Sequence, residues 1–556
     1  MSAASDPPPD ASAAPAGGAS EHVVTRHRGL LGRAALVSGL TLASRLLGFA
    51  REVLSAALFG HQSLLYDAFL TAWRIPNLFR RFFGEGALST SLTTELTAED
   101  ATHGDRRGSA LFLATLRLTT WVLAAVCGVS MLALFALQPW VLESLDPDLL
   151  VKRLATIELT VRVLPFLILI CLSALCAGGL NVRGHFLAPA LAPVLMNTAW
   201  IGTLLWIGWR LGDAPEIEQL RFLAWGVLGA GAVQLLALVP AMRRVGLFEG
   251  RGERSEGGGA KRVLLASAPL ALGAAAYQIN VLIDGLMALE WTERGGVTVH
   301  YLANRVQQFP LALIAIAAIT SVFPSLKALG QLERLGELRA LHDRTQLGVA
   351  FLALPATAGL FALAEPISRA LFLHGEFGEA GVQRLAPALA TMALALLPAG
   401  AVGLTSRAYF SRGDFRRPVR ISVVALLLNT GLNVVFVVVL DWDVIGLCLA
   451  TVITSWINLA LLLPGLVTHL GLPGAEPGQW TRLIRMTAAA AICGAVAYLS
   501  SRGVDALWGS LDARGAAIAT TVGSFAGAGA FFVAAQLLGL EEWRGTLDRV
   551  RKKFGR

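Results

Sequence analysis

Apolar segments long enough to span a bilayer recur along nearly the whole chain, from residue 33 to residue 540. Lipid offers no partner for backbone N–H and C=O groups, so a spanning chain satisfies them within helices of about 20 residues. The sequence therefore predicts an all-α, polytopic membrane protein with about 14 transmembrane helices. We place them at 33–58, 66–98, 109–137, 153–180, 186–209, 222–242, 262–289, 297–326, 345–364, 385–411, 418–440, 444–469, 483–500 and 515–539.

The composition supports a membrane protein. Hydrophobic residues make up 55% of the chain and charged residues only 15%, whereas soluble domains have about 25% charged residues. A net charge of +8 would suggest a nucleic-acid partner in a soluble protein. Basic loops beside a membrane explain it here, so we expect no nucleic-acid partner.

The distribution of Lys and Arg predicts the orientation. With the N-terminus inside, the expected cytoplasmic segments hold 28 of the 46 basic residues and the opposite loops hold 9. Because basic loops stay on the cytoplasmic side, we expect both chain ends in the cytoplasm.

The sequence also repeats itself at an offset of about 230 residues. "VRGHFLAP" at 182–189 matches "SRGDFRRP" at 411–418, and Asn197 recurs as Asn429. An offset of six helices gives both halves one orientation, with a substrate site between them. The predicted parts are a disordered cytoplasmic tail at 1–28, an N-lobe of helices 1–6 at 29–244, a cytoplasmic linker at 245–260, a C-lobe of helices 7–12 at 261–470, helices 13 and 14 at 471–540, and a basic cytoplasmic tail at 541–556.

Besides arginines near a span boundary, such as Arg117, Arg162 and Arg407, six arginines fall within the predicted spans. An uncompensated charge at the bilayer centre costs roughly 2.5–3.5 kcal/mol on insertion scales, so such residues face a partner or a water-filled cavity. The arginines are Arg45, Arg51, Arg74, Arg80, Arg81 and Arg305.

Helical spacing places these charges on one face of each of the first two helices. Arg45 and Glu52 are seven residues apart, as are Asp67 and Arg74, so each pair shares a face with a drift of only about 20°. Pro76 bends the second helix. A bent polar helix lines protein or water rather than lipid.

The arginines exceed the acids beside them. One alternative is that they only form structural ion pairs with Glu52, Asp67 and Glu85. Five arginines on the first two helices face just those three acids, and Arg305 has no acid in its span. This excess predicts an anionic ligand, and the planar fork of arginine suits phosphate.

A second polar group is expected between the seventh and eleventh helices. Asp284 is the one acid in its span, and Asn429 and Asn433 lie four residues apart. Their oxygens can bind a cation, and hydrogen bonding between helices is the alternative.

We expect neither an enzyme nor a cofactor. The five cysteines lie in apolar stretches without a CxxC or Cys–His pattern, so no disulfide or metal site is expected. The sequence has no Walker A loop, GxGxxG turn or HExxH motif. Transport would draw on an ion gradient, the membrane potential, the substrate gradient or a partner.

"ASRLLGFAREVLSAALFG" (43–60) and "DAFLTAWRIPNLFRRFFGEGALS" (67–89) resemble the signature of the MurJ (MviN) lipid II flippase family. The likeness runs from about residue 33 to the end and includes "YLANRVQQFPLAL" (301–313) and "YFSRGDFRRPV" (409–419). It is most specific in the first two helices.

The resemblance implies the multidrug/oligosaccharidyl-lipid/polysaccharide exporter fold, with two six-helix lobes and two further helices that form a lipid-facing groove. It implies a flippase in the bacterial cytoplasmic (inner) membrane that acts in peptidoglycan biosynthesis. Its substrate would be lipid II, an undecaprenyl-pyrophosphate-linked disaccharide-pentapeptide, carried to the outer leaflet by alternating access. Cell-wall synthesis machinery is an implied partner.

By motif, the resemblance also implies functional residues. Many members have Asp where this chain has Asn304, which puts an ion pair there in doubt. Sodium coupling in parts of the family implies an ion site at Asp284, Asn429, Asn433 and Thr451. The implied substrate-binding residues are Arg45, Arg51, Arg80 or Arg81, and Arg305, with Asp67 as their acidic partner.

Two other functions stay open from the sequence. One is a related exporter of another polyprenyl-linked glycan or of drugs, and the other is a membrane scaffold that transports nothing. A drug exporter does not need five arginines in the first two helices. A scaffold needs no intramembrane charge.

The orientation leads to a labelling prediction. Single cysteines in the N-terminal tail, in the 243–262 loop and in the C-terminal tail should resist an impermeant thiol reagent applied to intact cells. Efficient labelling of the 243–262 loop from outside would overturn the helix assignment.

Overall fold

The computed structural model describes residues 18–79, 87–142, 146–250, 258–475, 477–508, 512–540 and 542. These residues form helices and connecting turns without a strand, which confirms the all-α prediction. Ten helices in this part of the chain are long and apolar enough to cross a membrane. The four expected spans outside that set are 33–58, 66–98, 262–289 and 297–326, and each carries an intramembrane charge. The count of fourteen stays a prediction.

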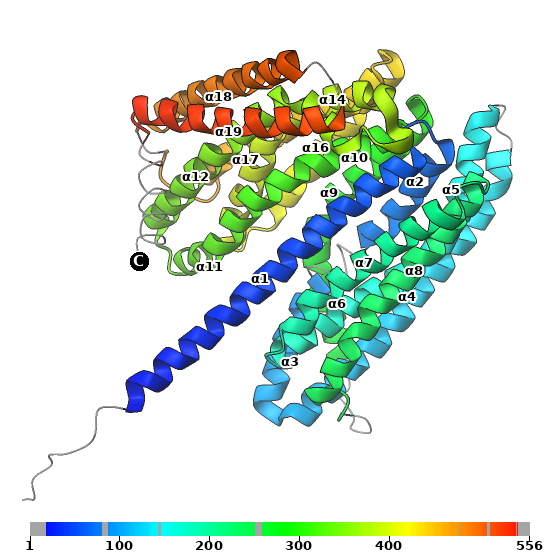
Figure 1. The fold of residues 1–556 in the computed structure, drawn as a ribbon. Coiled ribbons are helices and arrows are strands. Elements are labelled where there is room, and N and C mark those ends of the chain that lie inside the picture. The colour runs from blue at the N-terminus through cyan, green and yellow to red at the C-terminus, as the bar shows by residue number, and fades with distance from the viewer. Residues whose placement is uncertain are drawn as a thin grey trace, which may run out of the picture.

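Two lobes and a C-terminal pair make up the helical order (Figure 1). The first lobe contains α1 (Gly18–Phe59), α2 (Leu64–Phe79), α3 (Ala87–His103), α4 (Asp105–Leu142), α5 (Pro147–Val163), α6 (Phe166–Val182), α7 (Leu187–Arg210) and α8 (Glu216–Arg244). The second contains α9 (Gly259–Trp291), α10 (Gly296–Leu311), α11 (Ala317–Gln331), α12 (Leu335–Ala362), α13 (Ala364–Phe372), α14 (Gly378–Ala393), α15 (Leu396–Ser411), α16 (Arg416–Asn433) and α17 (Asp443–Thr468). The last two are α18 (Gln479–Trp508) and α19 (Ala513–Leu537).

Several expected boundaries differ from the structure. Helix α1 begins at Gly18, inside the expected disordered tail, where Ala, Glu and Arg are good helix formers that extend the apolar helix. Residues 66–98 contain two described helices, α2 and α3, and residues 80–86 between them lie outside the described part of the chain. Helix α13 was not expected at all. It is a short amphipathic helix whose Arg369 pairs with Glu379 at 2.5 Å.

Proline explains one interruption that both lobes share. The expected span 153–180 divides into α5 and α6 at Pro165, and the fourth segment of the second lobe divides into α14 and α15 just before Pro398. Proline has no N–H to donate and clashes with the preceding turn. The repeat therefore preserves a broken fourth segment in each lobe.

The outward surfaces of the helices are apolar, as lipid contact requires. On α4, Trp121 is 71% exposed and Leu132 is 70% exposed. Such a surface is rare on a soluble monomer. It supports insertion of these helices into a bilayer.

Arg183 and Arg412, from the repeated Arg-Gly motif, occupy corresponding places in the two lobes. Arg183 pairs with Asp100 at 3.0 Å and donates to the backbone oxygen of Asp105 at 2.8 Å, which holds the α3–α4 turn. Arg412 donates to the backbone oxygen of Gly330 at 2.9 Å and holds the α11–α12 turn. The motif repeats because each lobe uses its arginine to fix its own loop.

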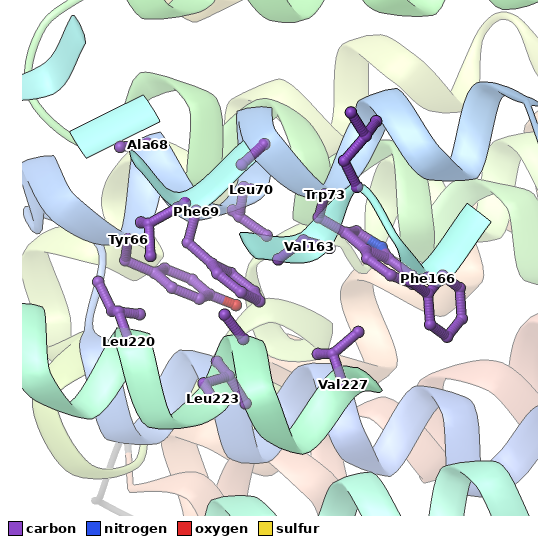
Figure 2. Packing of buried hydrophobic residues seen from close by; sticks show 14 of the residues in the cluster. Tyr66, Ala68, Phe69, Leu70, Trp73, Val163, Phe166, Leu220, Leu223 and Val227 are labelled. Atoms are coloured by element: carbon purple, nitrogen blue, oxygen red, sulfur yellow. The ribbon is translucent and has the colours of Figure 1, made fainter. Parts of the chain in front are cut away.

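Helix α2 presents different faces to the two lobes. Tyr66, Phe69 and Trp73 follow helical spacing and point between α5, α6 and α8 of their own lobe (Figure 2). Trp73 lies 5.0 Å from Phe166 between ring centroids. Packing of this kind holds α2 to the first lobe and leaves Asp67 for the second.

Asp67 joins the lobes through the N-terminus of α10. Its buried carboxylate accepts hydrogen bonds from Gly295 N at 2.9 Å, Thr298 N at 2.9 Å and Thr298 Oγ1 at 2.7 Å. A carboxylate at a helix N-terminus satisfies unpaired donors and favours the helix dipole. We had expected Asp67 to be an acidic partner of the arginines, but the hydrogen bonds that it makes to the described residues are those of a cap between the lobes.

Other contacts between the lobes gather around the same end, which we call the closed end. Lys152 Nζ donates to the oxygen of Leu289 at 3.1 Å, and Arg153 pairs with Glu290 at 2.5 Å. His61 Nδ1 lies 2.7 Å from the oxygen of Phe377, and burial lowers the pKa of His61. At the opposite end, Figure 1 shows α3 far from the α11–α12 turn.

Replacement of Asp67 by Ala should loosen the closed end. Three buried donors would lose their acceptor, and hydrogen bonds to charged groups contribute about 1.5–3 kcal/mol each. A cysteine at the fully buried position 71, one turn deeper on α2, should then react with a soluble maleimide about tenfold faster or more.

Thr298→Val provides the matched control, because it removes only the hydroxyl donor. It should produce a smaller increase in the labelling of the same cysteine. An unchanged labelling rate in Asp67→Ala would show that this cap does not hold the lobes together.

Candidate functional site

A polar cavity of about 430 Å³ lies between the lobes. Helices α1, α2, α6, α7 and α8 of the first lobe and α10 of the second lobe line it. Of the four predicted arginines that the structure describes, three line this cavity: Arg45, Arg51 and Arg305.

One carboxylate connects two of these arginines. Glu52, which is 4% exposed, accepts from Arg51 Nη2 at 2.5 Å and from the hydroxyl of Tyr301 at 2.9 Å. Arg305 Nε lies 3.7 Å from the same Glu52 oxygen. The acid that Arg305 lacks in its own span is therefore supplied by the other lobe.

Arg51 is also held within its own lobe. Its Nη1 donates to Asn197 Oδ1 at 3.3 Å, and its guanidinium lies 4.2 Å from the ring centroid of Trp200. Asn197 in turn donates to the backbone oxygen of Ser44 at 3.0 Å. These contacts fix Arg51 in place before any ligand arrives.

Arg45 lacks contacts of this kind among the described residues. It lines the cavity with an exposed side chain and has no hydrogen bond or ion pair with any residue that the structure describes. Among the described residues, the lining of the cavity thus contains three guanidiniums and no carboxylate, and Glu52 beside it contacts Arg51 and Arg305. The predicted residues Arg80 and Arg81 lie outside the described residues.

Arg74 does not line this cavity. It lines a side chamber of about 60 Å³ together with Asp284 and His300. The chamber shares Tyr301 and Arg305 with the cavity, so the two spaces adjoin. The prediction that all six arginines bind one ligand is therefore not supported for Arg74.

The predicted group around Asp284 is assembled in the structure. Asn433 Nδ2 donates to Asp284 Oδ1 at 2.7 Å and to Asn429 Oδ1 at 3.1 Å. The hydroxyl of Thr451 lies beside the Asp284 carboxylate. The helix continues as a π-helical turn directly after Asn433, at Val434–Val439, and such turns are frequent at functional sites.

Several polar residues of these sites were missed from the sequence. Tyr301, Gln234 and Asn280 were not predicted as site residues from the sequence. Asn280 Nδ2 nevertheless donates to Asp284 Oδ2 at 3.0 Å. Each of the three is a polar side chain within an apolar span, and in a membrane helix such a residue indicates a functional site. Asn304 accepts a hydrogen bond from Gln308 and lines the side chamber.

An apolar groove of about 600 Å³ shares two of its helices with the cavity. Helices α1, α10, α12, α13, α18 and α19 line it. Helix α1 presents Arg45 to the cavity and Leu46 to the groove, and α10 presents Arg305 to the cavity and Val306 to the groove. Two helices therefore line a charged space with one face and an apolar space with another.

Sequence comparisons connect the chain to characterised proteins. The sequence model of the family described as "Lipid II flippase MurJ" matches residues 55–512. A "Probable lipid II flippase MurJ" of Rhizobium meliloti (strain 1021) is 32% identical over 481 residues, which cover 85% of this chain and 86% of that protein. A "Lipid II flippase MurJ" of Burkholderia cenocepacia is 31% identical over 463 residues, covering 82% and 87%.

Solved structures share the fold. A structure described as "Lipid II flippase MurJ, inward closed conformation" matches with a TM-score of 0.72 at 20% identity, covering 91% of this chain and 99% of that chain. An inward-facing multidrug resistance MATE family transporter of the MOP superfamily matches with a TM-score of 0.62 at 15% identity, covering 82% and 99%.

The family model matches most of the chain, and both relatives exceed 30% identity over more than two thirds of it. With the helical fold described above, the conclusion is that this chain is a multi-pass protein of the bacterial inner membrane and belongs to the lipid II flippase MurJ family.

Proposed function

We propose that this protein is a lipid II flippase, a transporter rather than an enzyme. It would carry undecaprenyl-pyrophosphate-linked peptidoglycan precursor from the cytoplasmic to the outer leaflet. One observation carries the proposal: the same two helices, α1 and α10, line both the cationic cavity and the apolar groove. A lipid with a pyrophosphate head and a polyprenyl tail has the same two parts.

The cavity suits the head of such a lipid. A pyrophosphate cannot cross about 30 Å of hydrocarbon unaided, whereas its tail is soluble there. Arg45, Arg51 and Arg305 offer planar forks of donors that match phosphate oxygens. Charge-assisted hydrogen bonds contribute about 1.5–3 kcal/mol each, so three arginines can hold the head without a metal.

The interlobe contacts support transport by alternating access. The closed end is fastened by Asp67, Lys152 and Arg153, and we infer that it faces the extracellular side, with both chain ends in the cytoplasm. The cavity extends from Arg51 along α1 to Thr41, away from that end. Lipid II would enter from the cytoplasmic side and leave after these contacts break. Partners in cell-wall synthesis stay a prediction.

The Asp284 group suits a sodium ion that couples transport to a gradient. Hard cations take carboxylate, amide and hydroxyl oxygens, and Asp284, Asn429, Asn433 and Thr451 supply them. Asn433 Oδ1 is buried without a hydrogen-bond partner among the described residues. A bound cation would satisfy this oxygen and offset the Asp284 charge.

Replacement of Arg45 by Ala should abolish complementation of a flippase-depleted bacterial host. Loss of one charged contact weakens head binding by about 10- to 150-fold. Because Arg45 has no partner among the described residues, the amount of protein in the membrane should not change. Arg45→Lys keeps the charge without the bidentate fork and should restore growth in part.

Arg305→Ala should also fail to complement, and Arg210→Ala should succeed, since Arg210 lies over Trp209 at 4.3 Å and lines neither space. Membrane abundance must accompany each growth assay, because breaking a buried ion pair can unfold a protein. Growth supported by well-inserted Ala variants at both Arg45 and Arg305 would refute the cationic-cavity mechanism.

Sodium should stabilise the purified protein against thermal unfolding when choline chloride keeps the ionic strength constant. At ten times its Kd a ligand adds about 1.4 kcal/mol of stability. Asp284→Ala should remove this response, and Glu218→Gln, at an exposed position on α8, should keep it. Equal unfolding midpoints of the parent protein in sodium and choline would leave the Asp284 group as structural hydrogen bonds only.

A further inference from the structure

Arg74 is a buried cation next to the Asp284 group, and neither site described above uses it. Its side chain is on the face of α2 that turns toward the second lobe, and the residue is only 6% exposed. Its Nη1 has no hydrogen-bond partner among the described residues. A guanidinium buried this far from water needs a counter-charge nearby.

The backbone of α9 makes room for this guanidinium. A Cβ at Gly285 would clash with Arg74 Nη1 and would lie only 2.7 Å from Arg74 Cζ. Any side chain other than hydrogen at position 285 would therefore displace Arg74. Gly285 directly follows Asp284, so the close approach places the guanidinium beside the acid of the proposed cation site.

Arg74 and Asp284 both line the side chamber, but no hydrogen bond joins their described side chains. Both residues line its volume of about 60 Å³, which has room for about two waters. The hydrogen bonds that the described residues make to Asp284 come from Asn280 and Asn433, not from Arg74. The attraction between the two charges therefore acts without a hydrogen bond and leaves either free to take another partner.

The chamber also faces the central cavity. Arg305 and Tyr301 line both spaces, and Trp73, the residue before Arg74, does so too. A charge that changes inside the chamber therefore acts at short range on a ligand in the cavity, because the two spaces share lining residues.

We propose that Arg74 is a tethered counter-cation for Asp284, which links occupancy of the cation site to anion binding in the cavity. The inference rests on the proposed cation site. With that site empty, Arg74 balances Asp284. When a bound cation neutralises Asp284 instead, the positive charge of Arg74 becomes available to an anion in the cavity. The two ligands then favour each other, and the linkage is reciprocal.

The signs of the expected effects follow from competition. Arg74 and a bound cation compete for one carboxylate, so Arg74→Gln should raise the affinity for sodium, by about tenfold. A purely structural role for Arg74 would lower affinity or leave it unchanged. Arg74→Lys retains the charge and should stay near the parent value.

The test uses the purified full-length protein. Calorimetry measures sodium binding with choline chloride as the balancing salt, and inorganic pyrophosphate serves as the anionic probe of the cavity. In the parent protein, sodium should raise pyrophosphate affinity by a factor in the range of about 5–150. In Arg74→Gln this factor should fall at least fivefold while sodium affinity rises.

A second variant covers a failure of Arg74→Gln to fold. Gly285→Ala keeps every charge and displaces the guanidinium, so it should also raise sodium affinity. Sodium affinity that is unchanged or lower in every folded variant that displaces or neutralises Arg74 overturns the linkage, although the cation site and the flippase proposal stand. Absence of sodium binding to the parent overturns both cation site and linkage, whereas complementation by the Arg45 and Arg305 variants decides the flippase role separately.

Discussion

The arrangement of the two lobes depends on buried charged residues that have too few partners within their own helices. Glu52 is shared by Arg51 of its own lobe and Arg305 of the other, and Tyr301 adds a third contact. Buried ions in a membrane are stable only among partners or water. One carboxylate for several guanidiniums favours a water-accessible space between the lobes, and α1 and α10 bring these charges to it.

Helix α2 contacts both lobes and places charged residues between them. Tyr66, Phe69 and Trp73 fix one face in the first lobe, and Asp67 and Arg74 lie against the second lobe, at the start of α10 and on Gly285 of α9. A movement of one lobe against the other must therefore alter the surroundings of both charges. The same helix thus connects the closed end, the side chamber and the central cavity.

Much of this organisation could be predicted from the sequence. The energetic penalty of intramembrane charge identified Arg45, Arg51 and Arg305, and helix count with spacing brought Asp284 near Asn433. Other features depend on contacts between distant segments. Asp67 lies 228 positions before Gly295, so its role as a cap of α10 depends on how distant segments fold together. Arg74 enters a separate chamber because Gly285 has no side chain there.

Arg183 and Arg412 have a consequence for the speed of any lobe movement. Each fixes a loop of its own lobe, so these contacts survive when the ends beside them separate. At that end, α9 spans the division between the lobes, since Val263 packs with Leu88 and Phe112. In the proposed lobe movement, part of the activation barrier then comes from the charged hydrogen bonds of the closed end, at about 1.5–3 kcal/mol each, and part from the contacts of Glu52 with Tyr301 and Arg305. Under the proposed mechanism, a substitution at Arg183 or Arg412 would loosen a loop within one lobe and would break no contact between the lobes.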